Sequence, residues 1–233
     1  MTRDLDYFYA LLAHLEEQPG HGCTLADQTG NSAWPERGVY FFREPGELRS
    51  SQSGVSRVVR VGTHAVSTNS KSTLWGRLRA HRGGRAGGGN HRGSIFRLHA
   101  GAAMLARDWG DLPTWGIGSS ATKEIRLGEV GHEQRVSGYL GAMSVLWLKV
   151  PDEPGPNSAR AHIERNAIGL LSNGLSPVDH PSNEWLGLYS PREEIRRSGL
   201  WNLNHVAHRC EAGFLDLLES LVMRDLRDST GAG

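Results

Sequence analysis

Cysteine is scarce in this chain of 233 residues, which has only Cys23 and Cys210, far apart and outside any Cys-x-x-Cys spacing. The sequence therefore predicts neither a disulfide framework nor a structural zinc site, and it fits a reduced, cytoplasmic setting. Long apolar runs are missing as well, because no uncharged stretch approaches the ~18 residues of a membrane span. Asp4 and Asp6 interrupt the first apolar residues, so neither a signal peptide nor a membrane contact is expected.

Acidic residues are missing from a long internal stretch. Between residues 48 and 107 there is no Asp or Glu, while the stretch carries eleven Lys and Arg residues and four His. The whole chain has 26 basic and 25 acidic residues, so 15 basic and 25 acidic residues remain outside the stretch. Since an uncompensated basic block repels itself, it is most simply explained by a polyanionic partner whose phosphates supply the missing counter-charges.

The stretch 58–82 predicts a strand that runs through a tight turn into a basic helix. Valines at 58, 59 and 61 favour the strand, and Gly62 closes it. Ser72 or Thr73 can cap the helix that follows. Arg77 and His81 then lie one turn apart on the same face, where they could bind the same ligand. A solvated helix face is the alternative, and the surrounding basic charge argues against it.

Hydrophobic patterns predict the other elements. Helices are expected over residues 2–18, 94–107, 122–140, 158–171 and 214–226, with a short helix opened by Ser190 and Pro191, and further strands over 38–42 and 144–150. Residues 44–47 are expected to turn the chain, so that the first two strands pair antiparallel and bring Tyr40 near Gly62. The helix over 122–140 carries charges at helical spacing and is interpreted as a surface helix or an insertion.

A glycine-rich segment over 83–93 follows the basic helix. Backbone N–H groups of such a loop can bind phosphate, but the segment lacks the Lys-Ser/Thr ending of a P-loop and the Gly-x-Gly-x-x-Gly order of a dinucleotide turn. A flexible connector is therefore at least as good an interpretation, and a mononucleotide site is the weakest of the functions considered.

Short motifs follow one another in a definite order along the chain. They are Gly38-Val39-Tyr40 on the first strand, Val61-Gly62 at the end of the second, Arg77 with His81 one turn later, and Glu164 on a helix after the third strand. Each motif is unspecific alone, and their order and placement give the specificity. Together they resemble the GIY-YIG nuclease family, over residues 36–190.

The resemblance implies an α/β (α+β) fold in which a small three-stranded antiparallel sheet is flanked by helices. Residues 36–190 would form the nuclease core, residues 1–35 an N-terminal helix and loop, and residues 191–233 a C-terminal helical extension packed on the core. It also implies an endonuclease that hydrolyses DNA phosphodiester bonds by in-line attack of an activated water, with one divalent metal, Mg²⁺ or Mn²⁺.

The resemblance gives each catalytic residue a role. Tyr40 would orient or deprotonate the attacking water, and because a free phenol has a pKa of about 10 it would need help near neutral pH. Arg77 would hold the scissile phosphate, and His81 would bond Tyr40 or pass a proton. Glu164 would ligate the metal, since a lone carboxylate suits an ion that keeps several waters. Without the motifs, a core tyrosine and a surface glutamate would be the default interpretations.

Further residues are candidates for contacts to the DNA substrate. Arg79 belongs to the basic helix, and His91 and Arg92 lie at the far end of the glycine-rich segment. A histidine placed similarly to His91 follows the arginine helix in some members of the family. These side chains are expected to contact the substrate backbone.

The chain departs from the family pattern in two places. Arg60 stands where the second motif usually has a tyrosine, so the contact of that phenol would come from Arg60, from His64, or not at all. The family also has an asparagine downstream of the metal glutamate. Asn173 and Asn183 are both candidates, and Asn173 is favoured because it ends the helix that carries Glu164.

A rival function belongs to a different class. The Arg60 substitution and the basic block also fit a nucleic-acid-binding module that kept the scaffold and lost catalysis. No zinc finger, helix-turn-helix or other DNA-reading module is recognised that would set a sequence preference. Restriction, homing, repair and phage defence all remain open as roles.

Overall fold

Three strands form one antiparallel sheet in the order β2-β1-β3, in a computed structural model that describes residues 2–31, 34–177 and 179–230. The strands are β1 (Gly38–Leu48), β2 (Ser56–Gly62) and β3 (Ser144–Lys149). The pairing of β1 with β2 sets Tyr40 opposite Gly62, as the sequence predicts. The expected small antiparallel sheet is therefore confirmed.

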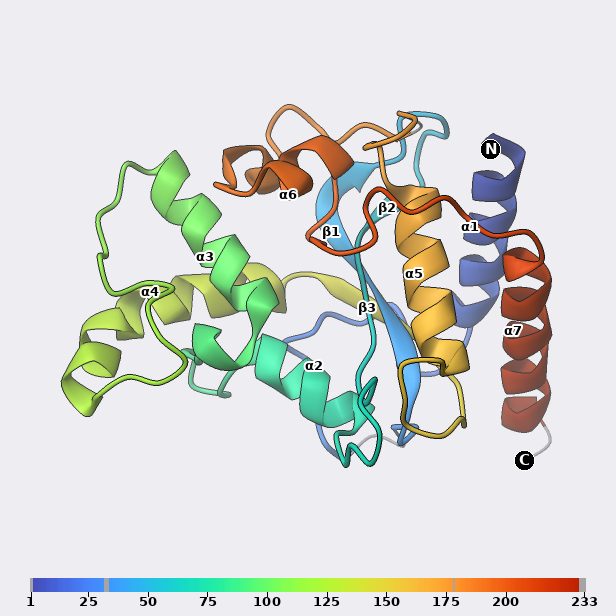
Figure 1. Cartoon of the computed structure of the whole chain (residues 1–233), viewed down its shortest axis with the longest axis horizontal. Coiled ribbons are helices and arrows are strands. Elements are labelled where there is room, and N and C mark those ends of the chain that lie inside the picture. The colour runs from blue at the N-terminus through green and yellow to red at the C-terminus, as the bar shows by residue number, and fades with distance from the viewer. Residues whose placement is uncertain (1, 32–33, 178, 231–233) are drawn as a thin grey trace.

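Helices cover both faces of this sheet. Their bounds are α1 (Thr2–Glu16), α2 (Leu74–Arg82), α3 (Ile95–Arg107), α4 (Lys123–Gly141), α5 (Ala159–Leu171), α6 (Glu193–Ser198) and α7 (Phe214–Thr230), with short 3₁₀ turns η1 (His91–Gly93) and η2 (Leu186–Tyr189). Figure 1 shows α1, α5 and α7 on one side of the sheet and α2, α3 and α4 on the other. The α+β class inferred from the resemblance is confirmed. No helix in the described part of the chain has the length and apolar character that crossing a lipid bilayer requires.

Alternation along β1 produces two hydrophobic cores. Val39 and Phe41 face the core built with α1, α5 and α7, while Tyr40 and Phe42 face the core built with α2 and α3. Successive strand residues point to opposite faces, so a strand buried on both sides reads as an unbroken apolar run. Because Phe41 is fully buried, truncating it to alanine would cost about 3–5 kcal/mol of stability.

The end of β1 differs from the expected turn at 44–47. The strand continues to Leu48 through two register shifts, and Gly46 adopts a φ of 83° inside it. Glu47 is nearly inaccessible and accepts hydrogen bonds from the Arg57 guanidinium of β2 at 2.8 and 2.9 Å. This buried ion pair holds the irregular segment against β2, which a local turn signal cannot reveal.

The pairing of β2 with β1 decides which face Arg60 occupies. Phe42 pairs with Arg60, and the register is regular from there to the pair of Tyr40 with Gly62. Paired residues, and residues two apart on one strand, share a face, so Arg60 lies on the same face of the sheet as Tyr40. Arg43 pairs with Val58, so the bulge, with Val59 as its extra residue, lies just beyond Arg60. The face that carries the phenol thus also carries a guanidinium.

Candidate active site

Tyr40 lies at the centre of the candidate site. Its ring is fully buried, and its hydroxyl forms a 2.8 Å hydrogen bond with Nε2 of His81 on α2. The ring packs directly over Gly62, where an added Cβ would lie 2.3 Å from the phenol Cζ and Oη. The glycine of the second motif therefore provides the space that the tyrosine of the first motif occupies.

His81 connects Tyr40 to the start of α3. Its Nδ1 forms a 2.7 Å hydrogen bond with Oγ of Ser94, the residue that caps α3. Burial, followed by the charges of Arg77, Arg60 and Arg97, holds the pKa of His81 well below its usual value of 6.5. The imidazole is therefore neutral at physiological pH, with one ring nitrogen protonated and the other able to accept a hydrogen bond.

Arg77 lies on α2, one turn before His81. Thr73 caps this helix by accepting a hydrogen bond from the Gly76 N–H, which selects it over Ser72 as the cap. Arg77 is partly buried and forms no ion pair with any described carboxylate. Its positive charge lowers the pKa of His81 and opposes the rise in the pKa of Glu164. It is available to bind an anion from outside the protein.

Glu164 reaches the site from α5. Its Oε1 accepts a 3.2 Å hydrogen bond from the Thr63 N–H, just beyond the end of β2. Burial raises its pKa above the usual 4.5, although the charges of Arg60 and Arg77 and the Thr63 hydrogen bond oppose that rise. Two chain segments more than a hundred residues apart therefore meet where β2 ends.

The described residues contain no group of three or more His, Cys, Asp or Glu side chains that could hold a metal. Glu164 still fits one kind of ion, because its Oε2 takes no hydrogen bond from the described part of the chain. A single free carboxylate oxygen suits Mg²⁺, which retains waters and takes other oxygens from phosphate. A zinc or calcium cage would need more protein ligands.

Arg60 completes the group of charged residues around Tyr40. It donates a short hydrogen bond to the Trp201 carbonyl, and its guanidinium lies 4.7 Å from the centre of the Phe96 ring. Burial lowers its pKa, and the Tyr40 hydroxyl and the Glu164 carboxylate oppose that effect. The arginine in the second-motif position is thus a buried neighbour of the phenol and the carboxylate.

Comparison with known proteins agrees with this geometry. A family model described as the GIY-YIG domain matches residues 1–227. The chain belongs to the GIY-YIG domain family. The match extends beyond both ends of the 36–190 core that the motifs delimit, and a GIY-YIG domain indicates a nuclease. No curated protein and no solved structure matches the chain.

His64 contacts backbone groups of this GIY-YIG domain through both of its ring nitrogens. Its Nε2 accepts a 3.3 Å hydrogen bond from the Gly38 N–H, and its Nδ1 lies 3.0 Å from the Ser72 carbonyl. Burial lowers its pKa to about 4. Both ring nitrogens are therefore used in holding the first motif, and the structure gives Arg60, rather than His64, the place beside Tyr40.

The two candidate asparagines lie away from Tyr40. Asn173 is buried and bridges the Asp179 and Ser198 carbonyls through its amide, while Asn183 is exposed on the segment before η2. Asn202 was not singled out in the sequence, yet its side chain bonds both the N–H and the carbonyl of Val61 at 3.1 and 2.8 Å. Its sequence context gives no signal of this contact, because the segment reaches β2 only through the tertiary fold.

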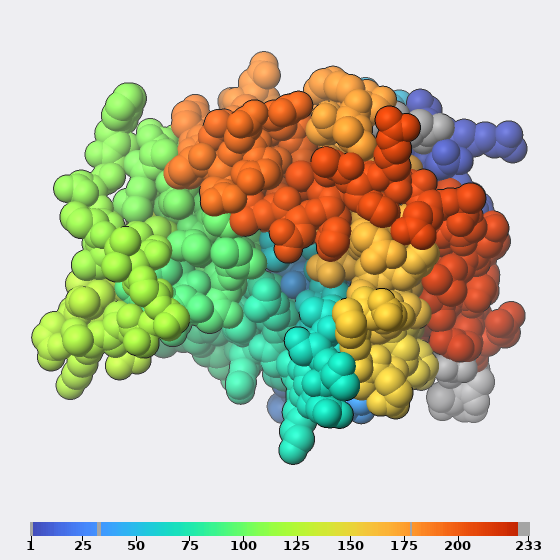
Figure 2. All heavy atoms as spheres, in the orientation of Figure 1, coloured from blue at the N-terminus to red at the C-terminus, as the bar shows by residue number. Residues whose placement is uncertain are grey.

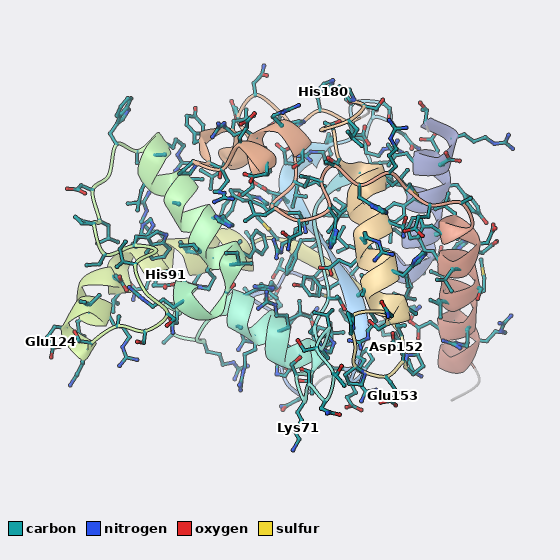
Figure 3. All side chains as sticks on the ribbon, in the orientation of Figure 1. Lys71, His91, Glu124, Asp152, Glu153 and His180 are labelled. Atoms are coloured by element: carbon teal, nitrogen blue, oxygen red, sulfur yellow. The ribbon has the colours of Figure 1, made fainter. Side chains whose placement is uncertain are left out.

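The remaining candidates for substrate contact divide into two kinds. Arg79 is exposed on α2. His91 and Arg92 are instead bound to carboxylates of α4, with His91 Nδ1 3.0 Å from Glu133 and Arg92 2.7 Å from Glu129. Figure 3 shows His91 beside α4 and the start of α3. The functional groups of His91 and Arg92 are therefore occupied within the protein.

The basic stretch 48–107 is less uncompensated than its sequence suggests. Five of its arginines form ion pairs with acidic residues, namely Arg49, Arg57, Arg92, Arg97 and Arg107. The others have no ion pair within the described ranges, and most of them lie on or beside α2, namely Lys71, Arg77, Arg79, Arg82 and Arg85. Positive charge is thus concentrated around the helix that carries Arg77 and His81. Figure 2 shows the surface hollowed between α2 and α5, below the orange C-terminal segment.

Proposed function

We propose that this protein is a metal-dependent endonuclease that hydrolyses DNA phosphodiester bonds by in-line attack of water. The observation that carries the proposal is the meeting of Tyr40, His81, Arg77 and Glu164 from three separate elements. Each of these side chains has a chemical task in phosphodiester hydrolysis. The family assignment supports the same reaction class.

Tyr40 and His81, joined by a hydrogen bond, together act as the general base. The phenol oxygen orients the attacking water and takes its proton, and the neutral imidazole can accept the phenol proton through Nε2. Ser94 holds the other ring nitrogen and so fixes the plane of the imidazole. Because Tyr40 is fully buried, neighbouring side chains must move before water and DNA reach the phenol.

Arg77 and Glu164 act on the phosphate side of the reaction. The Arg77 guanidinium binds the nonbridging oxygens and offsets the charge that grows in the transition state. Glu164 would hold Mg²⁺ or Mn²⁺, which when bound polarises the phosphoryl group and stabilises the leaving oxygen. The exposed cations around α2 contribute the sequence-independent attraction to the DNA backbone.

A plasmid nicking assay tests this function. Supercoiled DNA is incubated with the protein in Mg²⁺ or Mn²⁺ and in EDTA, and Glu164→Gln is compared with Glu124→Gln, a change at an exposed glutamate of α4. We expect nicking in either metal, none in EDTA, none by Glu164→Gln, and wild-type nicking by the control. Full activity in Glu164→Gln would remove the proposed role of that carboxylate.

A second function is favoured by two specific observations. The phenol is fully buried, and a buried arginine stands where the second motif usually has a tyrosine. Both fit a module that binds DNA through the cations of α2 without cutting it. In the same assay such a module would retard the plasmid in a gel and leave it unnicked in both metals.

A further inference from the structure

A separate hollow of about 310 Å³ lies beside Arg77 on the side of α3. Its lining includes Arg77, His91, Arg92, Gly93, Ile95 and Gly116. The hollow shares Arg77 with the candidate active site and is otherwise built from η1, the first turn of α3 and the loop between α3 and α4. A ligand in it would therefore lie next to any phosphate that Arg77 binds.

The outer wall of the hollow is fixed by buried side chains. Arg92 donates to the carbonyls of Thr114 and Ile117, both at 3.1 Å, while Glu129 neutralises its charge. The Gly116 N–H donates to Nε2 of His91 at 3.1 Å. His91 and Arg92 thus hold the loop that walls the hollow, which gives these two residues a role that the sequence could not show.

Trp115 holds the same wall from the inside. Its ring stacks on His91 with centroids 3.8 Å apart, and its indole N–H donates to the Leu98 carbonyl at 3.0 Å. With two stacked rings and hydrogen bonds on both sides, the loop needs little reorganisation to receive a ligand. A preformed site of this kind loses less free energy to ordering when it binds.

The lining combines one available cation with apolar surface. Ile95 lines the hollow and is 41% exposed, so it offers apolar surface to a ligand there. Phosphates alone give isoleucine nothing to pack against, whereas a base or a deoxyribose does. The volume lies at the lower end of the range for small-molecule sites, roughly 300–1,000 Å³, so it suits one nucleotide and not a base pair.

We propose that this hollow receives one unstacked nucleotide of the cleaved strand, next to the phosphate held by Arg77. The inference rests on the proposed function and adds the substrate class: DNA in which a nucleotide beside the cut is unpaired, as in a flap, a bulge or a single strand. A base must leave the helical stack before it can enter such a site, and the cost is least where it is already unpaired.

Filling the hollow tests the inference. Gly93 lines it, and a Cβ at this position would meet no atom within 4 Å, so this position accepts a side chain and Gly93→Leu adds apolar volume at the lining. Gly131→Leu is the matched control, because Gly131 lies on α4 in equally open space and outside the lining. Both variants receive the same change in size and polarity.

The first measurement is the rate of cutting of a duplex with one unpaired nucleotide against the fully paired duplex of the same sequence. We expect the wild-type protein and Gly131→Leu to prefer the unpaired substrate by roughly 10- to 100-fold, and Gly93→Leu to lose this preference. Equal rates on both substrates in the wild-type protein, or an unchanged preference in Gly93→Leu, would overturn the inference.

The second measurement does not depend on cutting. 2-Aminopurine, a base whose emission rises when it is unstacked, is scanned through the same DNA in EDTA buffer. We expect increased emission at one position with the wild-type protein and Gly131→Leu, and none with Gly93→Leu. Unstacking without any nicking in Mg²⁺ or Mn²⁺ would support the hollow and refute the hydrolysis. Nicking without unstacking at any position would refute the hollow alone.

Discussion

Gly62→Ala is the smallest change that tests whether the position of Tyr40 matters for the reaction. The new methyl carbon would lie 2.3 Å from the phenol Cζ and Oη, whereas an ordinary contact begins at 3.4 Å. The ring must therefore move by about 1 Å, which disrupts the 2.8 Å hydrogen bond to His81. A misplacement of about 1 Å can lower a rate roughly 100-fold, and we expect that loss in single-turnover cleavage.

The fold should survive this substitution. Overpacking a buried position costs about 1–3 kcal/mol, and for a chain of this size each kcal/mol lowers the melting temperature by roughly 2–4 °C. Thermal unfolding followed by circular dichroism should show that modest decrease. Gly138→Ala on α4 is the matched control, because a Cβ there meets nothing within 4 Å. It should retain wild-type activity and gain up to about 1 kcal/mol of stability, because alanine suits a helix interior better than glycine.

The expected result is therefore a large loss of cleavage with a small loss of stability and unchanged DNA binding. Binding is measured by gel retardation in EDTA, where no cutting occurs. Wild-type cleavage by Gly62→Ala, with a melting temperature that shows the strain is present, would refute the reasoning. It would mean that the phenol tolerates displacement and does not handle the attacking water.

Two further predictions concern charge. Arg60→Met should move the acid limb of the pH–rate profile to higher pH. Burial raises the pKa of Glu164 and the charge of Arg60 opposes that rise, so without Arg60 the carboxylate that must be ionised to bind metal has a higher pKa. An acid limb at the wild-type pH would show that Arg60 does not act on Glu164. Glu133→Gln should lower the free energy of unfolding by about 3–5 kcal/mol, because it leaves Arg97 buried without its counter-charge. Burial raises the pKa of Glu133, but hydrogen bonds from His91 and the charge of Arg97 bring it below its usual 4.5. The stabilisation by ionised Glu133 is therefore present above pH 4.5 and lost as the pH falls below it. The free energies of unfolding of wild type and Glu133→Gln, measured by urea titration, should converge in acid. A difference that stays constant with pH would contradict the role of Glu133 as the counter-charge of Arg97.

Local signals were sufficient for most elements and for the order of the motifs, although they placed a turn at 44–47 where β1 continues to Leu48. β-branched and aromatic runs marked the strands, and the capping residues Ser72 and Thr73 marked the start of α2. The pairing of Tyr40 with Gly62 followed from antiparallel strands joined in sequence. These features depend on neighbouring residues, so the sequence contains them directly.

Long-range contacts were not predictable in the same way. Arg92 and Arg97 bind Glu129 and Glu133 on α4, which lies outside the acid-free stretch. A count of charges along the chain therefore overestimated the number of positively charged side chains that are available to bind DNA. The contact of Asn202 with Val61 likewise joins segments that meet only after folding. Ion pairs and amide bonds of this kind are set by how helices pack, which hydrophobic periodicity does not encode.

We expect the phenol of Tyr40 to take part in phosphodiester hydrolysis, and one substitution tests this most directly. Tyr40→Phe removes one oxygen atom and its hydrogen bond to His81 while keeping the ring over Gly62. The measurement is the single-turnover rate of nicking in Mg²⁺, with DNA binding measured alongside in EDTA. Positioned acid–base groups contribute about 10²- to 10⁴-fold, so a rate lower by that factor, with binding unchanged, is expected. A wild-type rate of nicking in Tyr40→Phe would contradict the account.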